Sequence, residues 1–397
     1  MSSSAQPLPL AIAPASRFAC QRCGCCCKGL RQGRALEPED IARLAAHDWA
    51  AEHPRLRAGW RLEPQSPGAP ARLRLVEGGR CVFLDDDDLC LVQRRLGYEA
   101  KPLRCRAFPF RFARVGEELR LSISAECRGW WRSYATGPQV VETPELRAMA
   151  RRLPGTVLVG ERFALLAGGG AGQAELGREQ LLALLDDLAG AARADEPLER
   201  LPWRFAWACR RALGGQLPPS PWQLPGPPES SFYAVLHVLG EALGPLAQRL
   251  GLGLIASAFA ELRRWQLWER AARALAEQAA CFVRQVLAQQ VHELRPLVLG
   301  PVVAGAGMCL YLAMGSAVGA WRRAALGRGG AAASGDDANA AAAQAARLLR
   351  ARPALAQFAA HALALERLVL DAPPPAAPRQ PAAGAAPEGG ASGPAAS

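Results

Sequence analysis

The stretch from Phe18 to Cys27 reads Phe-Ala-Cys-Gln-Arg-Cys-Gly-Cys-Cys-Cys and places five cysteines within eight positions. Two overlapping CxxC pairs begin at Cys20 and Cys23, and a further cysteine follows the second pair directly. A CxxC turn lets two thiolates converge on one metal while backbone N–H groups point at the sulfurs. Gly24 permits a tight bend between such ligands. The stretch therefore predicts a small domain whose fold is organised by bound metal.

The remaining cysteines of this region follow at wider spacing. Nine of the twelve cysteines lie between Cys20 and Cys127, and arginines flank the last two of these nine. Cationic neighbours lower the pKa of thiols and offset the charge of a thiolate-rich site. The adjacent pair Cys26-Cys27 is not expected to face one small tetrahedral site comfortably. The pair thus favours either a cluster with several metal atoms or two neighbouring sites.

Composition adds constraints on compartment and partners. The formal net charge is +11, but the chain has only two lysines, Lys28 and Lys101, and its arginines are scattered along the whole length. A nucleic-acid surface would gather basic residues and aromatics in one patch, so no nucleic-acid partner is expected. The N-terminus lacks a basic start followed by a long apolar run. We therefore expect a cytoplasmic protein whose dense cysteines bind metal rather than form disulfides.

Periodicity predicts an α+β fold: a small cysteine-rich, metal-bound domain with short strands, then a mainly α-helical domain. A helix is expected at 38–51, a hairpin within 110–123 and a second small hairpin at 156–166. The expected helices of the second domain are 176–193, 198–213, 229–249, a broken 253–293, 297–323 and 339–370. The expected domains are a disordered N-terminus at 1–16, the cysteine-cluster domain at 17–136, the helical domain at 137–370 and a disordered tail rich in Pro, Ala and Gly at 371–397.

One segment could span a bilayer by length. Leu297 to Trp321 is 25 residues without a charge, and it is the only candidate span in the sequence. It contains five glycines and a proline, and the neighbouring helices are amphipathic. We expect a buried helix of the C-terminal domain and no membrane association.

Beyond these patterns, the chain resembles a known family. The CxxCGxCC start, the CxFL segment at Cys81, the PxxCRxFPF segment at Cys105 and the closing CxG are similar to the YkgJ-type cysteine-cluster family, a zinc- or iron-chelating domain. The resemblance covers about residues 17–130, and Cys25 falls at a variable position of the pattern. The resemblance implies that the metal ligands are Cys20, Cys23, Cys26, Cys27, Cys81, Cys90, Cys105 and Cys127.

A more distant resemblance is to flagellin lysine-N-methylase, whose first cysteine group is spaced more widely. Three hypotheses follow. The first is a metal-binding protein with an iron–sulfur cluster, of the 4Fe–4S type, or zinc, whose helical domain receives a protein partner or substrate. The second is an iron–sulfur-dependent lysine methyltransferase, and the third is a zinc-stabilised structural module. Soft thiolates suit both metals. The adjacent cysteines and the resemblance favour iron–sulfur.

Other catalytic signals are weak. The glycine-rich stretch from Gly168 to Gly172 lacks the full spacing of a dinucleotide loop. His47 and His53 lie nearest the cysteines, and we expect them on a helix surface rather than in the metal site. The acidic run from Asp85 to Asp88 is expected to be a solvated turn rather than a site for a hard metal. The catalytic residues, if the protein is an enzyme, are not predicted by the sequence.

Overall fold

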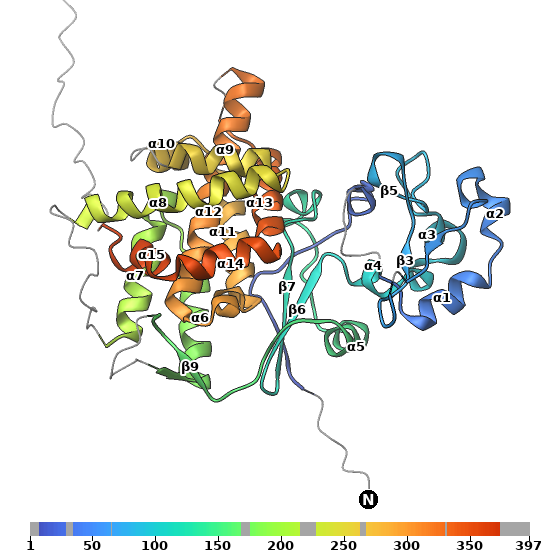
Figure 1. The fold of residues 1–397 in the computed structure, drawn as a ribbon, viewed down its shortest axis with the longest axis horizontal. Helices are drawn as coiled ribbons and strands as arrows, with labels where there is room; N and C mark the ends of the chain where they lie inside the picture. The colour runs from blue at the N-terminus through green and yellow to red at the C-terminus, as the bar shows by residue number, and fades with distance from the viewer. Residues whose placement is uncertain are drawn as a thin grey trace, which may run out of the picture.

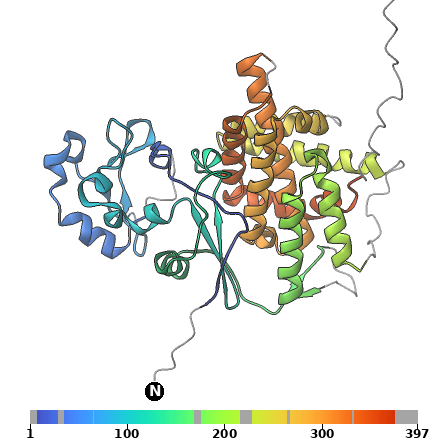
Figure 2. The ribbon, with the colours of Figure 1, turned by 180° about the vertical axis from the view of Figure 1, so that it is seen from behind.

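The computed structural model describes residues 8–28, 35–64, 66–167, 175–214, 228–262, 267–329 and 332–373. Figure 1 shows a cysteine-rich module at one end, a bundle of helices at the other, and a sheet between them, and the view from behind in Figure 2 gives the same order. The predicted α+β class, with short strands first and helices after, is therefore confirmed.

The cysteine-rich module is built from short elements around a small core of its own. That core is formed by buried apolar residues between Leu36 and Ala100, with Trp49 and Phe83 in edge contact at its centre. The expected helix at 38–51 is split in two. The elements are η1 (Cys25–Cys27), α1 (Pro38–Ala45), α2 (Trp49–Glu52), β2 (Arg61–Leu62), β3 (Arg72–Leu73), β4 (Leu75–Val76), β5 (Arg80–Cys81), α3 (Leu91–Leu96) and α4 (Leu103–Ala107).

The predicted hairpin at 110–123 is confirmed and forms the middle of a four-stranded sheet. Strands β6 (Phe110–Val115) and β7 (Glu118–Ile123) pair antiparallel. With β1 (Leu10–Ile12) and β8 (Pro154–Leu158) at the edges, the sheet order is β1-β7-β6-β8. Alternate side chains point to opposite faces of a strand. Phe112 therefore packs with Met149 of α5 (Pro144–Arg152), whereas Ala113 on the other face belongs to the core of the helical bundle.

The hairpin strands contribute to the helical core although they precede the expected domain boundary between 136 and 137. Ala113, Val115 and Ile123 are part of the bundle core, so both strands of the hairpin belong with the helical part. The core of the cysteine-rich module ends at Ala100, and Leu103 and Ala107 of α4 pack with Phe112 of the sheet. The sequence pattern predicts the hairpin but not the core to which it belongs. Both faces of these strands are buried, and each face packs against a different core.

The structure of the N-terminus also differs from the prediction. Residues 1–16 were expected to be disordered, but Leu10–Ile12 form β1, which pairs parallel with Leu119–Leu121 of β7. Three residues are too few for a periodic signal, and the pairing is non-local. Residues 1–7 lie outside the described part of the chain. So does the expected tail beyond Pro373.

The prediction of a second hairpin at 156–166 is also wrong. Strand β8 (Pro154–Leu158) and strand β9 (Arg162–Ala164) exist, but they do not pair with each other. β8 runs parallel to β6 at the edge of the main sheet, and β9 pairs with β10 (Glu175–Gly177). The partner of β8 is thus distant in sequence, whereas the partner of β9 is the next strand along the chain.

The predicted helices are confirmed, and two expected long helices are broken into three each. The bundle consists of α6 (Arg178–Arg193), α7 (Leu201–Ala212), α8 (Pro228–Arg249), α9 (Gly253–Leu262), α10 (Leu267–Arg273), α11 (Glu277–His292), α12 (Val302–Arg328), α13 (Gly335–Leu348), α14 (Arg352–Ala360) and α15 (Ala362–Leu370).

Helix α12 occupies the centre of the bundle and contains most of the apolar segment from Leu297 to Trp321. Within the described residues it is the one helix long and apolar enough to cross a membrane, and its apolar window is wholly buried by protein. Gly305 and Gly307 let it approach the backbones of Pro296 and Leu365 closely. The helix is thus covered by neighbours in this fold, as a central helix of a bundle must be.

Candidate metal centre

The first cysteine group forms one tight turn. Gly24 adopts a left-handed conformation with φ of 62°, and η1 (Cys25–Cys27) follows it directly. In this turn the Sγ atoms of Cys26 and Cys27 are 3.8 Å apart. Zinc–sulfur bonds of about 2.3 Å in a tetrahedron place sulfurs about 3.8 Å apart. The distance between these adjacent sulfurs is thus compatible with one small tetrahedral site, although the sequence favoured a cluster or two sites.

The acidic run between Cys81 and Cys90 holds the first turn in place. A Cβ atom on Gly24 would lie 2.7 Å from the carbonyl oxygen of Asp88, so the two turns are packed together. Lys28 Nζ lies 2.6 Å from Asp88 Oδ2 and ties the end of the first turn to the acidic run. Asp85 accepts the backbone N–H of Leu89 at 2.7 Å and pairs with Arg94. These carboxylates therefore have structural partners, consistent with a turn rather than a hard-metal site.

Five of the eight predicted ligands line one cavity of about 730 Å³ between the cysteine-rich module and the helical part. Cys81 is buried on β5, Cys105 lies in α4, and Cys90 precedes the first residue of α3. The first turn contributes the other two, Cys26 and Cys27. Four short elements thus bring five thiols to one wall.

The other predicted ligands form a flanking group. A Cβ on Gly129 would lie 3.6 Å from Cys23 Sγ, so the Cys127 turn is packed against the first CxxC pair. Burial raises the pKa of Cys127 to about 12, against the effect of the Gly129 N–H, and the nearby sulfurs of Cys26, Cys23 and Cys20 add to the increase. Cys25, which the family pattern leaves out, interacts with Cys23.

Burial and mutual contact favour the neutral form of the thiols in this protein. The hydrogen bond to Cys27 raises the pKa of Cys26 well above its usual range, and burial adds to the effect. Burial raises the pKa of Cys105 to about 12, helped by the charge of Cys90 and opposed by Lys101. A soft metal cation reverses this balance, because a coordinated thiol is deprotonated outright. A thiol-only set of this kind fits zinc or an iron–sulfur cluster.

Two further features define the donor set. His47 pairs with Glu52 at 3.1 Å and His53 Nδ1 accepts the N–H of Arg55, so neither lines the cavity. Among the described His, Cys, Asp and Glu residues, no group of three already has the arrangement of metal ligands. Metal binding therefore requires thiol side chains to rotate toward one another. The assignment of all eight cysteines as ligands stays a prediction.

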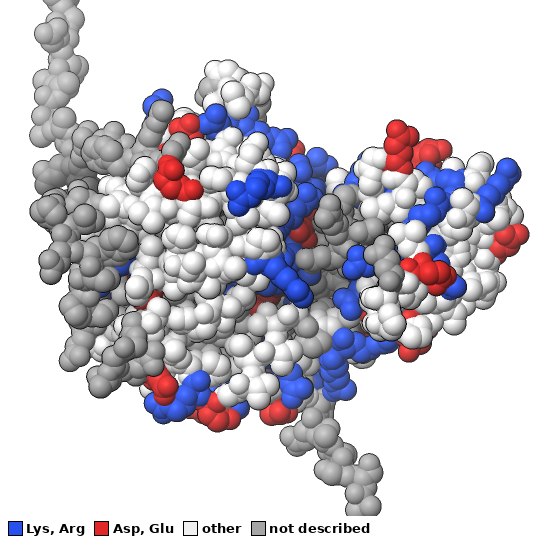
Figure 3. Space-filling model, in the orientation of Figure 1, with Lys and Arg blue, Asp and Glu red and all other residues white. Residues whose placement is uncertain are grey.

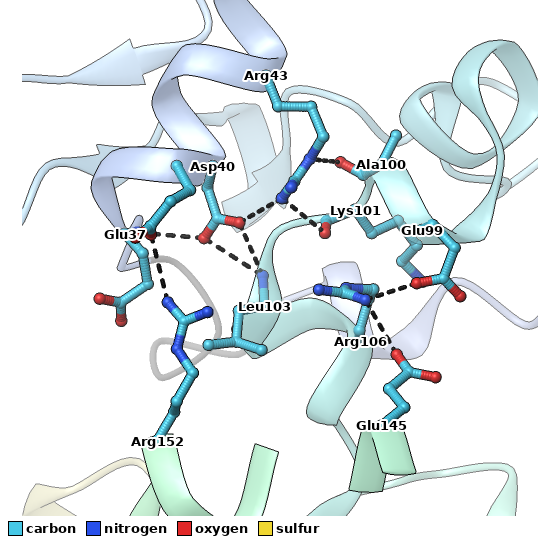
Figure 4. A network of polar contacts seen from close by, with 11 residues as sticks. Glu37, Asp40, Arg43, Glu99, Ala100, Lys101, Leu103, Arg106, Glu145 and Arg152 are labelled. Atoms are coloured by element: carbon cyan, nitrogen blue, oxygen red, sulfur yellow. Dashed lines mark hydrogen bonds and ion pairs between the residues drawn. The ribbon is translucent and has the colours of Figure 1, made fainter. Parts of the chain in front are cut away.

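A buried carboxylate orients the segment that carries Cys105 (Figure 4). Asp40 of α1 is 2% exposed, and its oxygens accept the backbone N–H of Leu103 at 3.1 and 3.2 Å. Arg43 contacts Asp40 at 2.5 Å and donates to the carbonyls of Ala100 and Lys101. Leu103 begins α4, so Asp40 caps the helix that presents Cys105.

We expect Asp40→Asn to destabilise the module by about 2 kcal/mol, because hydrogen bonds to a charged group contribute roughly 1.5–3 kcal/mol. The amide also places its NH₂ group next to the N–H donors that the carboxylate accepts from, so donors would face donors. Hydrogen exchange of peptides from residues 36–107 should show faster opening, and metal content should fall. Glu39→Gln on the same helix is the matched control, since Glu39 is exposed and pairs only with Arg152 among the described residues. Equal exchange in both variants would contradict the role of Asp40.

Sequence reasoning missed the supporting residues of this centre. Asp40 reads as an ordinary acidic residue in a first helical turn, and only the fold reveals that it reaches α4. Lys101 lies near four of the thiols: burial alone would lower its pKa, but the sulfurs of Cys90 and Cys105 raise it above the usual value. Its position four residues before Cys105 was the available signal.

Comparison with protein families gives one match. Residues 19–128 match the family model CxxCxxCC, described as "putative zinc- or iron-chelating domain". Comparisons with curated proteins and with solved structures gave no significant match. The matched segment begins beside Cys20 and ends just after Cys127, so it contains every cysteine of both thiol groups. Residues 19–128 are therefore similar to the domain that the CxxCxxCC family model describes as zinc- or iron-chelating.

Proposed function

We propose that this protein carries an iron–sulfur cluster, of the 4Fe–4S type, on the cysteines of its N-terminal module and uses it as a functional centre. The observation that supports this is the single cavity of about 730 Å³ lined by five of the thiols. Structural zinc sites are closed around their ion. A cavity of this size leaves room for a cluster and for a molecule beside it.

The electrostatics of the cavity also suit a cluster. Lys101 lies close to four thiols, and Arg104 lines the same wall. Cations near the sulfurs stabilise the negative charge that thiolate ligands confer on a cluster. The far wall of the cavity comes from the sheet and the helical bundle, so the helical part would serve as the platform for a substrate or partner.

Zinc is the second candidate, and one distance favours it. The 3.8 Å between the sulfurs of Cys26 and Cys27 fits two ligands of one tetrahedral ion. A methyl transfer to lysine is a narrower form of the iron–sulfur proposal, suggested by the resemblance to flagellin lysine-N-methylase. The glycine-rich stretch considered for a nucleotide site, Gly168 to Gly172, lies outside the described residues.

Anaerobic purification tests the metal. We expect brown protein with broad absorption near 400 nm, an approximate position for thiolate-bound iron–sulfur clusters, and with iron and acid-labile sulfide in similar amounts. Cys281→Ser is the matched control, because Cys281 is exposed on α11 and does not line the thiol cavity; it should keep the colour. Colourless protein with stoichiometric zinc would contradict the cluster and support the closed zinc site.

A further inference from the structure

The wall of the cavity opposite the cysteines is made of charged residues from distant parts of the chain. Arg111 lies on β6, Glu126 just before Cys127, and Glu293 and Arg295 after α11; Arg350 follows α13. Figure 3 shows Lys and Arg side chains on both sides of the hollow between the two lobes. Among the described residues that line the cavity, seven are Lys or Arg and two are Glu.

The two carboxylates of this wall do not balance its three guanidinium groups. Glu126 is shared: its Oε1 lies 2.5 Å from Arg350 Nη2 and its Oε2 lies 3.2 Å from Arg111 Nη2. Glu293 contacts Arg295 at 2.5 Å and accepts a hydrogen bond from Ser122 at 3.4 Å. One positive charge of the wall is therefore in excess.

Arg350 shares Glu126 with Arg111 and is buried. Its side chain is 11% exposed, and its Nε atom has no hydrogen-bond partner among the described residues. Burial lowers the pKa of Arg350 to about 10, and the neighbouring charge of Arg111 acts in the same direction. A buried donor without a partner is costly, which points to a ligand that supplies an acceptor.

The thiolate charge does not account for this wall. The cations nearest the sulfurs belong to the cysteine side of the cavity: Lys101 beside four thiols, and Arg104, which lies 3.6 Å from Glu37. The charged groups that act most strongly on Arg350 are Arg111, Glu126, Glu293 and Arg295, all of the opposite wall. The excess positive charge of this wall is thus a separate feature of the cavity.

We propose that the cavity binds a small molecule through its oxyanion group, a carboxylate or a phosphate, held by Arg350 and Arg111 on the wall facing the cysteines. A guanidinium group binds either oxyanion with two parallel N–H···O bonds. The placement of this ligand beside a metal rests on the proposed function. The anion site itself rests on the arginine wall, whichever metal the cysteines hold.

Titration calorimetry of the full metal-loaded chain tests the site, with inorganic phosphate and a small dicarboxylate such as succinate as the two probes. We expect one molecule of one probe to bind per chain, and the tighter probe identifies the chemical source. Arg350→Gln should weaken binding at least about tenfold, since it removes a charged bidentate contact. Arg347→Gln is the matched control: Arg347 is exposed in the last turn of α13, three residues before Arg350 and outside the cavity, and its replacement should leave the affinity unchanged.

Arg350→Lys keeps the positive charge and the ion pair with Glu126, so it decides the outcome if the glutamine variant does not fold. We expect it to retain its metal and to bind the probe several times more weakly. Absence of binding by both probes, or equal weakening in the Arg347 variant, overturns the proposal. Colourless, zinc-loaded protein that still binds the oxyanion would overturn the iron–sulfur cluster and leave the anion site standing.

Discussion

Replacing Cys105 by serine is expected to remove most of the bound metal and to unfold the cysteine-rich module while the helical bundle stays folded. Cys105 lies on α4, and its thiol lines the same cavity as the thiols of four other cysteines. In small metal domains the free energy of metal binding, about 10–16 kcal/mol for structural zinc, is also folding free energy. Loss of one thiolate therefore removes a large part of what stabilises the module.

The separation of cores makes this unfolding local. The buried apolar residues of the module lie between Leu36 and Ala100 and form a cluster distinct from the core of the bundle. The elements of the module are short: its strands are two residues long and α1, its longest helix, has eight residues. Such a small core has little stability without a metal or another cross-link.

Hydrogen exchange and metal analysis measure this prediction together. Peptides from residues 36–107 should exchange rapidly in the Cys105→Ser variant, and peptides from α11 and α12 should exchange as in the unmodified protein. Cys281→Ser makes the same chemical change at an exposed position of α11 and should alter neither readout. Unchanged metal content and unchanged protection of the module in Cys105→Ser would show that Cys105 is not a ligand.

How much of the fold could be predicted depended on how local each signal is. The hairpin of β6 and β7 was predicted because alternation on both sides of Gly116 lies within one short stretch. The same holds for the helices, whose periodicity is local. β1 and β8 were not placed correctly, because each pairs parallel with a strand far along the chain. Parallel strands are not joined by a short turn, so no local turn signal in the sequence predicts their pairing.

The same difference between local and non-local signals applies to the candidate site. The thiol wall could be predicted, since thiols at CxxC spacing carry their chemistry in the residue type. The facing wall could not, because Arg111, Glu126 and Arg350 meet only after the sheet and the bundle have packed. In a chain with so many arginines, no single arginine stands out. Asp40 was missed for the same reason, as its partner Leu103 lies 63 residues away.

Gly307→Ala is expected to destabilise the helical bundle strongly. A Cβ atom at Gly307 would lie 2.1 Å from the carbonyl oxygen of Leu365 in α15. The obstacle is backbone, so no side-chain rotation relieves the clash, and α12 and α15 would have to separate. Overpacking of a core costs about 1–3 kcal/mol and occasionally more. We expect a loss at or above the upper end of that range.

Gly327→Ala is the matched control on the same helix. No atom lies within 4 Å of a Cβ placed there, so the substitution brings only the better helix propensity of alanine, a gain of up to about 1 kcal/mol. Thermal unfolding followed by far-UV circular dichroism should show a lower midpoint for Gly307→Ala and an equal or higher midpoint for Gly327→Ala. The pair also tests the placement of α12. A helix that faced lipid instead of α15 would accept the methyl group at both positions, so equal midpoints would contradict its burial in the bundle.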